Sequence, residues 1–374
     1  MKESITIRNF GPIKEISIDD IRPFTVFIGQ SGSGKSTIMK VVVLFQWLYK
    51  MLCIRSYLKY ANISQSPFNF DFKSYLANGG LVGYLQDDTD IIYQKGKTFI
   101  HYRKKLGTSP LVPEDELSLE KMSFISDKRN LIPDILAGYN TEMNFYLNET
   151  YSDFKKAEEH VKELSLDYLN VKYQAEKINS RMQYFILDKE GAYKIKLESA
   201  SSGTQTLVPL SVIMEYFSKH YDFKKRFNAI VLDYMAQNDS LKDFRAMQNI
   251  GDIKHRNIHI HIEEPELSLY PESQCDLINS IVGSCFVQAH DGYNMSVMLT
   301  THSPYIINHL NLLIRAYDRN KLITGQANLR YENVAVYQVI DGGVKDLKLK
   351  NERLIYTNPL SDTINDIYDE YHDL

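Results

Sequence analysis

One short glycine-rich segment limits the fold of this chain more than any other feature. An apolar run with Phe24, Val26 and Ile28 precedes it, and the mostly apolar stretch 38–52 follows it. These runs predict a buried strand and then a helix. The pattern Gly-x4-Gly-Lys-Ser between a strand and a helix is typical of a phosphate-binding loop. The segment consists of Gly29, Gln30, Ser31, Gly32, Ser33, Gly34, Lys35, Ser36 and Thr37.

The residue types in this loop fit the chemistry of a nucleoside triphosphate. Glycines let successive backbone N–H groups turn toward the β- and γ-phosphates, and the positive helix N-terminus and the Lys35 ammonium offset the phosphate charge. The Ser36 hydroxyl can bind Mg²⁺. The sequence therefore predicts a site for ATP and Mg²⁺ at residues 29–37.

A second apolar strand, at residues 258–262, ends in two adjacent carboxylates. Neighbouring residues at a strand end point in different directions, so Glu263 and Glu264 can take different roles. We predict that Glu263 faces the Mg²⁺ ion and that Glu264 orients or deprotonates the attacking water. His259 and His261 alternate on the same strand without a third ligand at a suggestive spacing, which favours structural histidines over a metal site.

Two more loops stand directly before predicted helices. Ser201, Ser202 and Gly203 precede a helix at 207–217, and Thr301-His302-Ser303-Pro304 follows a strand at 296–299. A serine at such a place is often only a helix cap. A hydroxyl with N–H groups at a helix start also binds anions, and a histidine can donate to a phosphate.

Composition excludes several classes of protein. The chain has 374 residues, of which 44% are apolar and 24% charged, and its formal charge of -4 gives no general affinity for nucleic acid. Its three cysteines have no C-x-x-C spacing, which fits a reducing cytosol. The N-terminus does not have the pattern of a signal peptide, and the apolar window 41–53 is interrupted by polar residues and shorter than a membrane span. We therefore expect a cytoplasmic protein without membrane segments.

Strands that alternate with helices predict an α/β fold with a mostly parallel sheet and a site at its C-terminal edge. Apolar residues at steps of three and four from 154 to 182 predict a heptad helix, and 184–197 predicts a hairpin. We expect one head over 1–374, divided into an N-terminal hairpin and phosphate loop (1–63), an insertion or lateral sheet (64–135), a helical lobe (136–200), a core (201–330), and a C-terminal hairpin with an acidic helix (331–374).

Together the motifs carry a family resemblance. Phe10-Gly11-Pro12-Ile13, Ser201-Ser202-Gly203, the stretch 262–271 (IEEPELSLYP) and Thr301-His302-Ser303-Pro304 occur in an order that resembles the ABC-type ATPase heads of Rad50, RecF and overcoming-lysogenization-defect proteins. The likeness is greatest to small stand-alone defence ATPases such as PtuA and AriA. It implies an ABC-type head with an N-terminal β-hairpin lobe, a parallel core and an inserted helical lobe.

The resemblance also implies roles for individual residues. Ser201, Ser202 and Gly203 match the signature loop that reaches the γ-phosphate of a partner subunit, and His302 matches the switch histidine. Glu263 stands where many relatives carry Asp. Gln86 is a candidate for the glutamine loop by its order alone. Arg129 lies in a segment that resembles an arginine-containing motif of the small defence ATPases. It is a candidate for contact with phosphate or with a partner, and the alternative is a surface salt bridge.

Two functions follow as hypotheses. The first is an ATPase that dimerises or forms a higher homo-oligomer around ATP and regulates a separate effector, a nuclease or toxin from the same operon, in anti-phage defence. The alternative is a RecF- or Rad50-like DNA-binding ATPase in repair. The basic runs at 103–105 and 224–226 are short and typical of solvated surfaces, so they favour neither. A transporter motor is disfavoured by the departures around the signature and residues 263–266.

Overall fold

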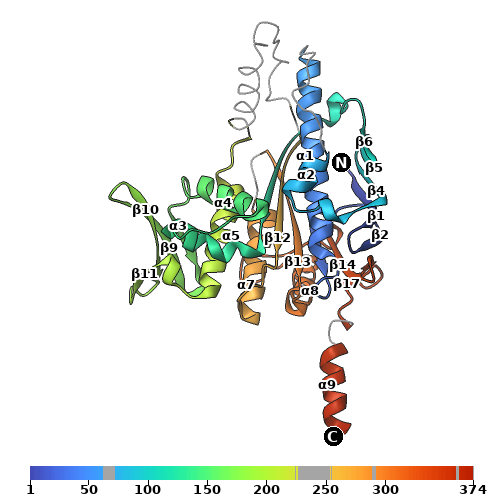
Figure 1. Cartoon of the computed structure of the whole chain (residues 1–374). Coiled ribbons are helices and arrows are strands. Elements are labelled where there is room, and N and C mark those ends of the chain that lie inside the picture. Colours follow the sequence, from blue (N-terminus) through green and yellow to red (C-terminus); the bar gives the residue numbers. More distant parts are fainter. Residues whose placement is uncertain are drawn as a thin grey trace.

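A six-stranded sheet forms the centre of the computed structural model (Figure 1). The structure describes residues 1–61, 72–223, 225, 253, 255–288, 292–358 and 362–373. The strands of this core sheet, in spatial order, are β15 (Gly343–Asp346), β14 (Val334–Ile340), β3 (Phe24–Ile28), β13 (Asn294–Thr301), β12 (His255–Glu263) and β7 (Ser118–Ile125). All of their pairings are parallel except that of β14 with β15. The carboxyl ends of β3, β13 and β12 therefore meet at one edge.

An antiparallel lobe lies beside the core sheet. Its strands, in spatial order, are β2 (Ile13–Ile18), β1 (Glu3–Phe10), β4 (Leu85–Lys95), β5 (Thr98–Arg103) and β6 (Lys105–Thr108). Helix α1 (Lys35–Tyr60) packs between this lobe and the core sheet (Figure 1). By length and composition α1 could cross a membrane, but 67% of its most apolar stretch is buried inside the fold. Such burial is typical of a core helix.

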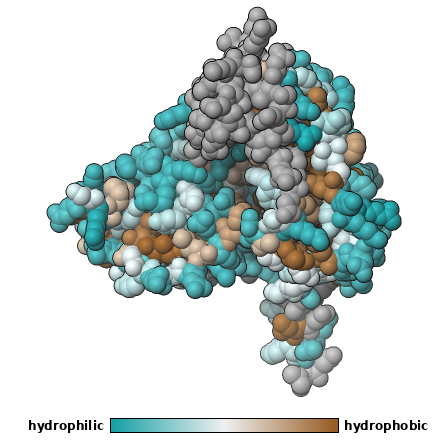
Figure 2. Space-filling model, turned by 45° about the horizontal axis from the view of Figure 1, so that its top comes forward, coloured by the Kyte–Doolittle hydropathy of each residue, from teal (hydrophilic) through white to brown (hydrophobic). Residues whose placement is uncertain are grey.

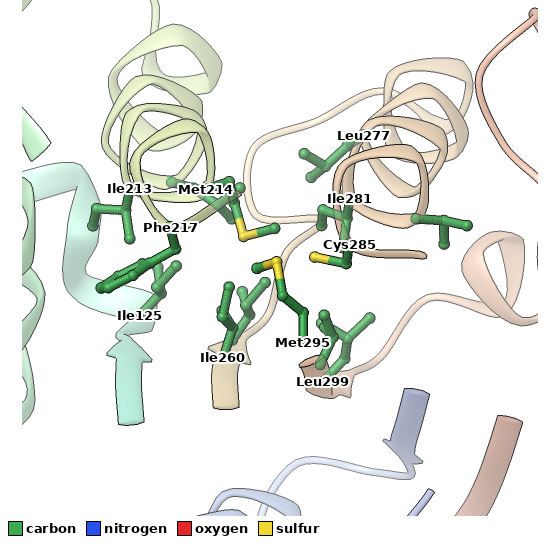
Figure 3. Packing of buried hydrophobic residues seen from close by; sticks show 14 of the residues in the cluster. Ile125, Ile213, Met214, Phe217, Ile260, Leu277, Ile281, Cys285, Met295 and Leu299 are labelled. Carbon is green, nitrogen blue, oxygen red and sulfur yellow. The ribbon is translucent and has the colours of Figure 1, made fainter. Parts of the chain in front are cut away.

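Helices α5 (Ser202–Lys219) and α7 (Pro271–Val282) cover the other face of the core sheet. Figure 3 shows Phe217 of α5, Ile281 of α7 and Ile260 of β12 among the buried side chains of this interface. The apolar residues of β12 and β13 thus face helices on both sides, which explains why these strands read as nearly continuous apolar runs.

The segment 136–200 differs from the predicted heptad helix. The α-helical parts of this segment are α4 (Phe145–Ala157) and the end of α3 (Ile132–Ala137). A four-stranded antiparallel sheet follows, formed by β8 (Glu163–Leu166), β9 (Val171–Ile178), β10 (Arg181–Asp188) and β11 (Lys194–Lys196). The helix over 154–182 was wrong because Val171 and Ala175, four apart, fit a period of two as well as a helical period. Asn170 and Asn179 adopt positive φ angles that interrupt a helix.

The other predicted elements are present. Hairpins form at β1–β2, β10–β11 and β14–β15, and the α/β class with a β-rich N-terminal lobe and a parallel core is confirmed. Strand β7 lies in the core sheet and not in the lateral sheet expected for 64–135. The signature lies further upstream of the carboxylate strand than in transport ATPases, which makes 214–257 an expected insertion; most of this stretch lies outside the described residues. The long helix α8 (Pro304–Asp318) follows β13.

The remaining elements are short or peripheral. They are α2 (Phe72–Asn78), η1 (Val82–Tyr84), η2 (Glu114–Glu116), η3 (Asp127–Leu131), η4 (Asp167–Leu169), η5 (Leu197–Ser199), the π-helix η8 (Gly283–Val287), η9 (Tyr331–Asn333), β16 (Lys348–Leu349), β17 (Leu354–Ile355) and α9 (Asp362–Asp373). Helix α9 projects from the body of the molecule (Figure 1), and the surface in the view of Figure 2 is mostly hydrophilic.

Candidate nucleotide site

The glycine-rich loop joins β3 to α1, as predicted. Gly34 directly precedes α1 with φ at 104°, a conformation that favours glycine. At Gly29 a Cβ atom would lie 2.5 Å from the backbone oxygen of Val339, because β14 passes close by. The two glycines are therefore required for different reasons, one for the turn into the helix and the other for close contact with a neighbouring strand.

Two polar groups of the loop point to an anion. Lys35 is 5% exposed, and its ammonium donates to the backbone oxygens of Gly29 at 2.9 Å and Gln30 at 2.8 Å. Burial lowers the pKa of Lys35, while Glu264 and Glu266 raise it. Among the described residues, the buried hydroxyl of Ser33 has no hydrogen-bond partner. A phosphate would supply an acceptor to both groups.

Glu263 ends β12 in a buried position beside the start of α1. The neighbouring Ser36 hydroxyl helps to lower its pKa, and its carboxylate oxygen Oε1 lies 3.0 Å from Nζ of Lys40. Burial raises the pKa of Glu263, and the neighbouring ammonium of Lys40 lowers it. The two predicted Mg²⁺ ligands, Ser36 and Glu263, are thus in contact. Two protein oxygens fit Mg²⁺, which usually takes its other ligands from phosphates and water.

Glu264 has a strained backbone and a half-exposed side chain. Its φ angle is +43°, which is unusual for a residue with a side chain, and its N–H donates to the carbonyl oxygen of Thr300 at 2.9 Å. The turn directs its carboxylate out of the sheet edge, where the side chain is 37% exposed and Oε1 lies 3.4 Å from Nε2 of His302. Adjacent glutamates therefore point in different directions, one buried and one open to solvent.

The loop after β13 is held by a third carboxylate. Oε1 of Glu266 accepts hydrogen bonds from the Thr301 hydroxyl at 2.8 Å and from the backbone N–H of His302 at 2.6 Å. Ser303 caps α8 by accepting from the N–H of Ile306. The helix cap is thus Ser303, and the side chain of His302 is left to face Glu264.

Arg129 is a buried structural residue, which replaces the phosphate, partner and surface interpretations of the sequence. Its side chain is 0% exposed. The guanidinium donates to the carbonyl oxygens of Ser126 at 3.1 Å, Glu263 at 2.7 Å and Glu264 at 2.7 Å. Burial lowers its pKa to about 10, so the group stays charged near neutral pH. Arg129 therefore fixes the turn that carries both glutamates.

The signature residues lie at the start of α5, on the other side of the core sheet from α1 (Figure 1). Ser201 caps this helix by accepting from the N–H of Thr204 at 3.4 Å, and the side chains of Ser201 and Ser202 are exposed. A Cβ atom on Gly203 would lie 2.9 Å from the carbonyl oxygen of Ser268. Among the described residues, no hydrogen bond joins the signature to the phosphate loop.

Gln86 lies close to the N-terminal turn. Its side-chain amide donates to the carbonyl oxygen of Gly11 at 3.4 Å, and Pro12 is a near neighbour of Gly34. Its identity as the glutamine-loop residue stays a prediction.

The two histidines of β12 make the structural hydrogen bonds expected for them. His259 contacts Ser296 at 2.7 Å and Glu120 at 2.6 Å, and Nδ1 of His261 contacts the carbonyl oxygen of Ser123 at 3.3 Å.

Sequence reasoning missed the supporting contacts around this edge. Lys40 lies within α1, and no local pattern predicts its contact with Glu263. Glu266 belongs to the motif at 262–271, yet only the tertiary structure connects it to His302. The position of Arg129, four residues after the end of β7, was the available signal for a role at the sheet edge.

The parallel core, the phosphate loop and the carboxylates at the sheet edge define an ATPase head. A family model described as an AAA ATPase domain matches residues 1–71 and 85–307, and the chain belongs to this family. It is therefore an ATPase that binds its nucleotide through a domain of this kind. No functionally curated protein matches the sequence.

Three solved structures illustrate its likeness to other proteins. An SMC head bound to the C-winged helix domain of ScpA is 12% identical, with a TM-score of 0.37 and coverage of 93% of this chain and 98% of that one. The recombination mediator RecF is 10% identical, with a TM-score of 0.34 and coverage of 92% and 98%. A dimeric bacterial ABC transporter cassette is 13% identical, with a TM-score of 0.30 and coverage of 91% and 96%.

Proposed function

We propose that this ATPase is a cytoplasmic, Mg²⁺-dependent head that closes as a homodimer around ATP and regulates a separate effector in anti-phage defence. One observation carries the proposal: the carboxyl ends of β3, β12 and β13 bring Lys35, Glu264 and His302 to a single edge of the core sheet. The defence role rests on the motif resemblance, and the chemistry rests on this edge.

Nucleotide binding uses the phosphate loop. The backbone N–H groups of residues 29–37 and the α1 N-terminus attract the phosphates, and the Lys35 ammonium exchanges two loop carbonyls for phosphate oxygens. Ser36 and Glu263 would hold Mg²⁺, which would neutralise phosphate charge. The donor set fits this ion because both residues supply oxygen, the element that Mg²⁺ prefers.

Hydrolysis uses the groups that face solvent at the same edge. Glu264 accepts a proton from the attacking water, and His302 donates a hydrogen bond to the phosphate that is released. Glu266 fixes the backbone beside His302, and Arg129 fixes the carbonyl of Glu264. We propose that ATP hydrolysis is slow, because its rate sets how long the dimer stays closed and thereby regulates the effector.

The signature requires a second subunit. A helix N-terminus attracts an anion only over its first turn, and the start of α5 is exposed on the side of the sheet away from α1. A partner in a two-fold arrangement brings Ser201, Ser202 and Gly203 to the phosphates bound by this chain. The symmetric pair then contains two composite sites.

Subunit mixing tests this arrangement. Lys35→Ala removes the ammonium from the phosphate loop and should abolish ATP retention, and Ser201→Arg should block the signature. Each variant alone is expected to be inactive. A mixture should regain about one working site per mixed dimer, because one interface combines the intact Lys35 with the intact Ser201. Mixtures no more active than their parents, with pairing intact by light scattering, would contradict the shared site.

The effector is tested by co-expression with the genes that adjoin this one. A nuclease or toxin whose activity depends on the Lys35 and Glu264 variants supports the defence role. ATPase stimulation by duplex DNA without such a dependence would favour the repair alternative.

A further inference from the structure

A cavity lies beside the first half of α1. Its volume is about 490 Å³, and it is lined mainly by residues of α1, α2, β7 and α4. Pockets of a few hundred cubic ångströms are the usual size for small organic ligands. The phosphate loop itself does not line this cavity, so it is distinct from the ATP site.

The lining combines aromatic rings with positive charge. Trp47 and Tyr75 pack with ring centroids 4.3 Å apart, and Phe145 and Tyr146 line the same space. The charged residues that line it are Lys40, Lys50, Lys121, Lys156 and Glu149. Lys40 is paired with Glu263, and Lys121 and Lys156 are paired with Asp153. Aromatic walls suit a flat apolar group, and an acid group would compete with these carboxylates for the lysine ammoniums.

Lys40 connects this cavity to the Mg²⁺ side of the ATP site. Its ammonium lies 3.0 Å from Oε1 of Glu263 and 4.7 Å from the centroid of the Tyr146 ring, which lines the cavity. The side chain of Lys40 is 22% exposed, whereas that of Glu263 is 5% exposed. An anion in the cavity can therefore reach Lys40 from the side opposite Glu263.

We propose that the cavity binds a small organic anion with an aromatic ring, and that its acid group draws the Lys40 ammonium away from Glu263. Once Lys40 is drawn away, no ammonium competes with Mg²⁺ for the Glu263 carboxylate, so the ligand lowers the Mg²⁺ concentration that ATP binding requires. The binding of the anion does not depend on the proposed function, but its coupling to ATP binding rests on the proposed role of Glu263 as a Mg²⁺ ligand.

Trp47 makes the cavity directly observable, because the chain contains a single tryptophan. The probe is 8-anilinonaphthalene-1-sulfonate, and its uncharged counterpart is N-phenyl-1-naphthylamine. We expect saturable quenching of Trp47 by both, with the sulfonate bound roughly tenfold more tightly because it gains a charged hydrogen bond. Val43→Phe, which fills the cavity, should abolish the quenching without touching Glu263.

The lysine variants test the charge. Lys40→Gln should remove most of the preference for the sulfonate, and Lys59→Gln, on an exposed part of the same helix, should leave it unchanged. Quenching that persists in Val43→Phe, or equal affinity for the two probes, would overturn the proposed site. Absence of saturable quenching in the parent would do the same.

A separate measurement tests the coupling. The sulfonate should lower the Mg²⁺ concentration at half-maximal ATP binding by about fivefold in the parent protein and not in Lys40→Gln. Sulfonate binding with an unchanged Mg²⁺ requirement would overturn the coupling. Lys35→Ala should lose ATP binding but bind the sulfonate like the parent. This variant therefore distinguishes a wrong assignment of the phosphate loop from a wrong assignment of the cavity.

Discussion

Arg129→Met removes the group that fixes the turn at the end of β12, which carries Glu263 and Glu264. The substitution keeps an apolar stem of similar length but removes the guanidinium donor from the carbonyl oxygens of Ser126, Glu263 and Glu264. The oxygens of Ser126 and Glu264 keep a backbone donor, the N–H groups of residue 129 and of Leu267. We expect two effects, a loss of stability from the missing hydrogen bonds, chiefly at Glu263, and a loss of hydrolysis from the displacement of Glu264.

The contacts give the size of the stability effect. Hydrogen bonds to a charged group contribute about 1.5–3 kcal/mol each, but burying the guanidinium offsets part of this. Removing the donor of a buried carbonyl oxygen costs about 1–3 kcal/mol in the free energy of unfolding. For a chain of this size the midpoint of thermal unfolding should fall by about 1–4 °C.

The backbone of Glu264 gives the size of the catalytic effect. Its φ angle of +43° is a left-handed conformation that costs about 1–2 kcal/mol. Without Arg129 this turn can relax, and a displacement of the carboxylate by about 1 Å lowers turnover on the order of 10²-fold. ATP binding should change little, because Arg129 makes no hydrogen bond to the phosphate loop among the described residues.

Thermal unfolding, ATP binding and single-turnover hydrolysis are measured on the same preparations. Lys128→Met is the matched control, since Lys128 is the exposed neighbour in the same motif and should leave all three quantities unchanged. Arg129→Lys, which can donate to fewer carbonyls, should give a smaller loss and keeps the test usable if the methionine variant does not fold. A methionine variant that melts and hydrolyses ATP like the parent would refute the role of Arg129.

Three further predictions concern the site and the core. Glu264→Gln should keep ATP binding and slow hydrolysis by at least about 10²-fold, because the amide cannot accept the proton of water; unchanged turnover would place the base elsewhere. Gly34→Ala and Gly138→Ala both introduce a Cβ at strongly positive φ and should destabilise the fold similarly, by about 1–2 kcal/mol, but only Gly34→Ala should weaken ATP binding. Burial lowers the pKa of His261 to about 3, so the folded chain keeps this ring neutral while the unfolded chain protonates it below 6.5. The free energy of unfolding should therefore fall as the pH is lowered below 6.5, by about 2 kcal/mol at pH 5. Urea titrations should show a smaller fall in His261→Gln and an unchanged fall in His372→Gln.

Local patterns predicted the elements that position the site. The loop at 29–37, the strand that ends at Glu263 and the helix after Ser201 could be recognised because each depends on neighbours in the chain. Apolar runs bounded by glycines report burial, and a glycine pattern reports backbone conformation. These properties belong to short segments, so the sequence alone determined the α/β class and the phosphate-binding loop.

The same reasoning failed where a pattern fits two periods. Apolar residues at 171 and 175 are four apart, which suits a helix and a strand equally, and the partner strand β10 decided the outcome. A strand is chosen by hydrogen bonds to a neighbour, and those hydrogen bonds are not visible in the segment itself.

Only the tertiary structure decided which groups support the reacting edge. Lys40 meets Glu263, Arg129 meets the carbonyls of Glu263 and Glu264, and Glu266 meets His302. Lys40 and Arg129 lie more than a hundred residues from their partners. Residue type and local spacing specify what a side chain can bind, but the packing of distant strands and helices specifies what it does bind. The sequence of this protein therefore determined the chemistry available at the sheet edge, and the fold decided how that chemistry is held in place.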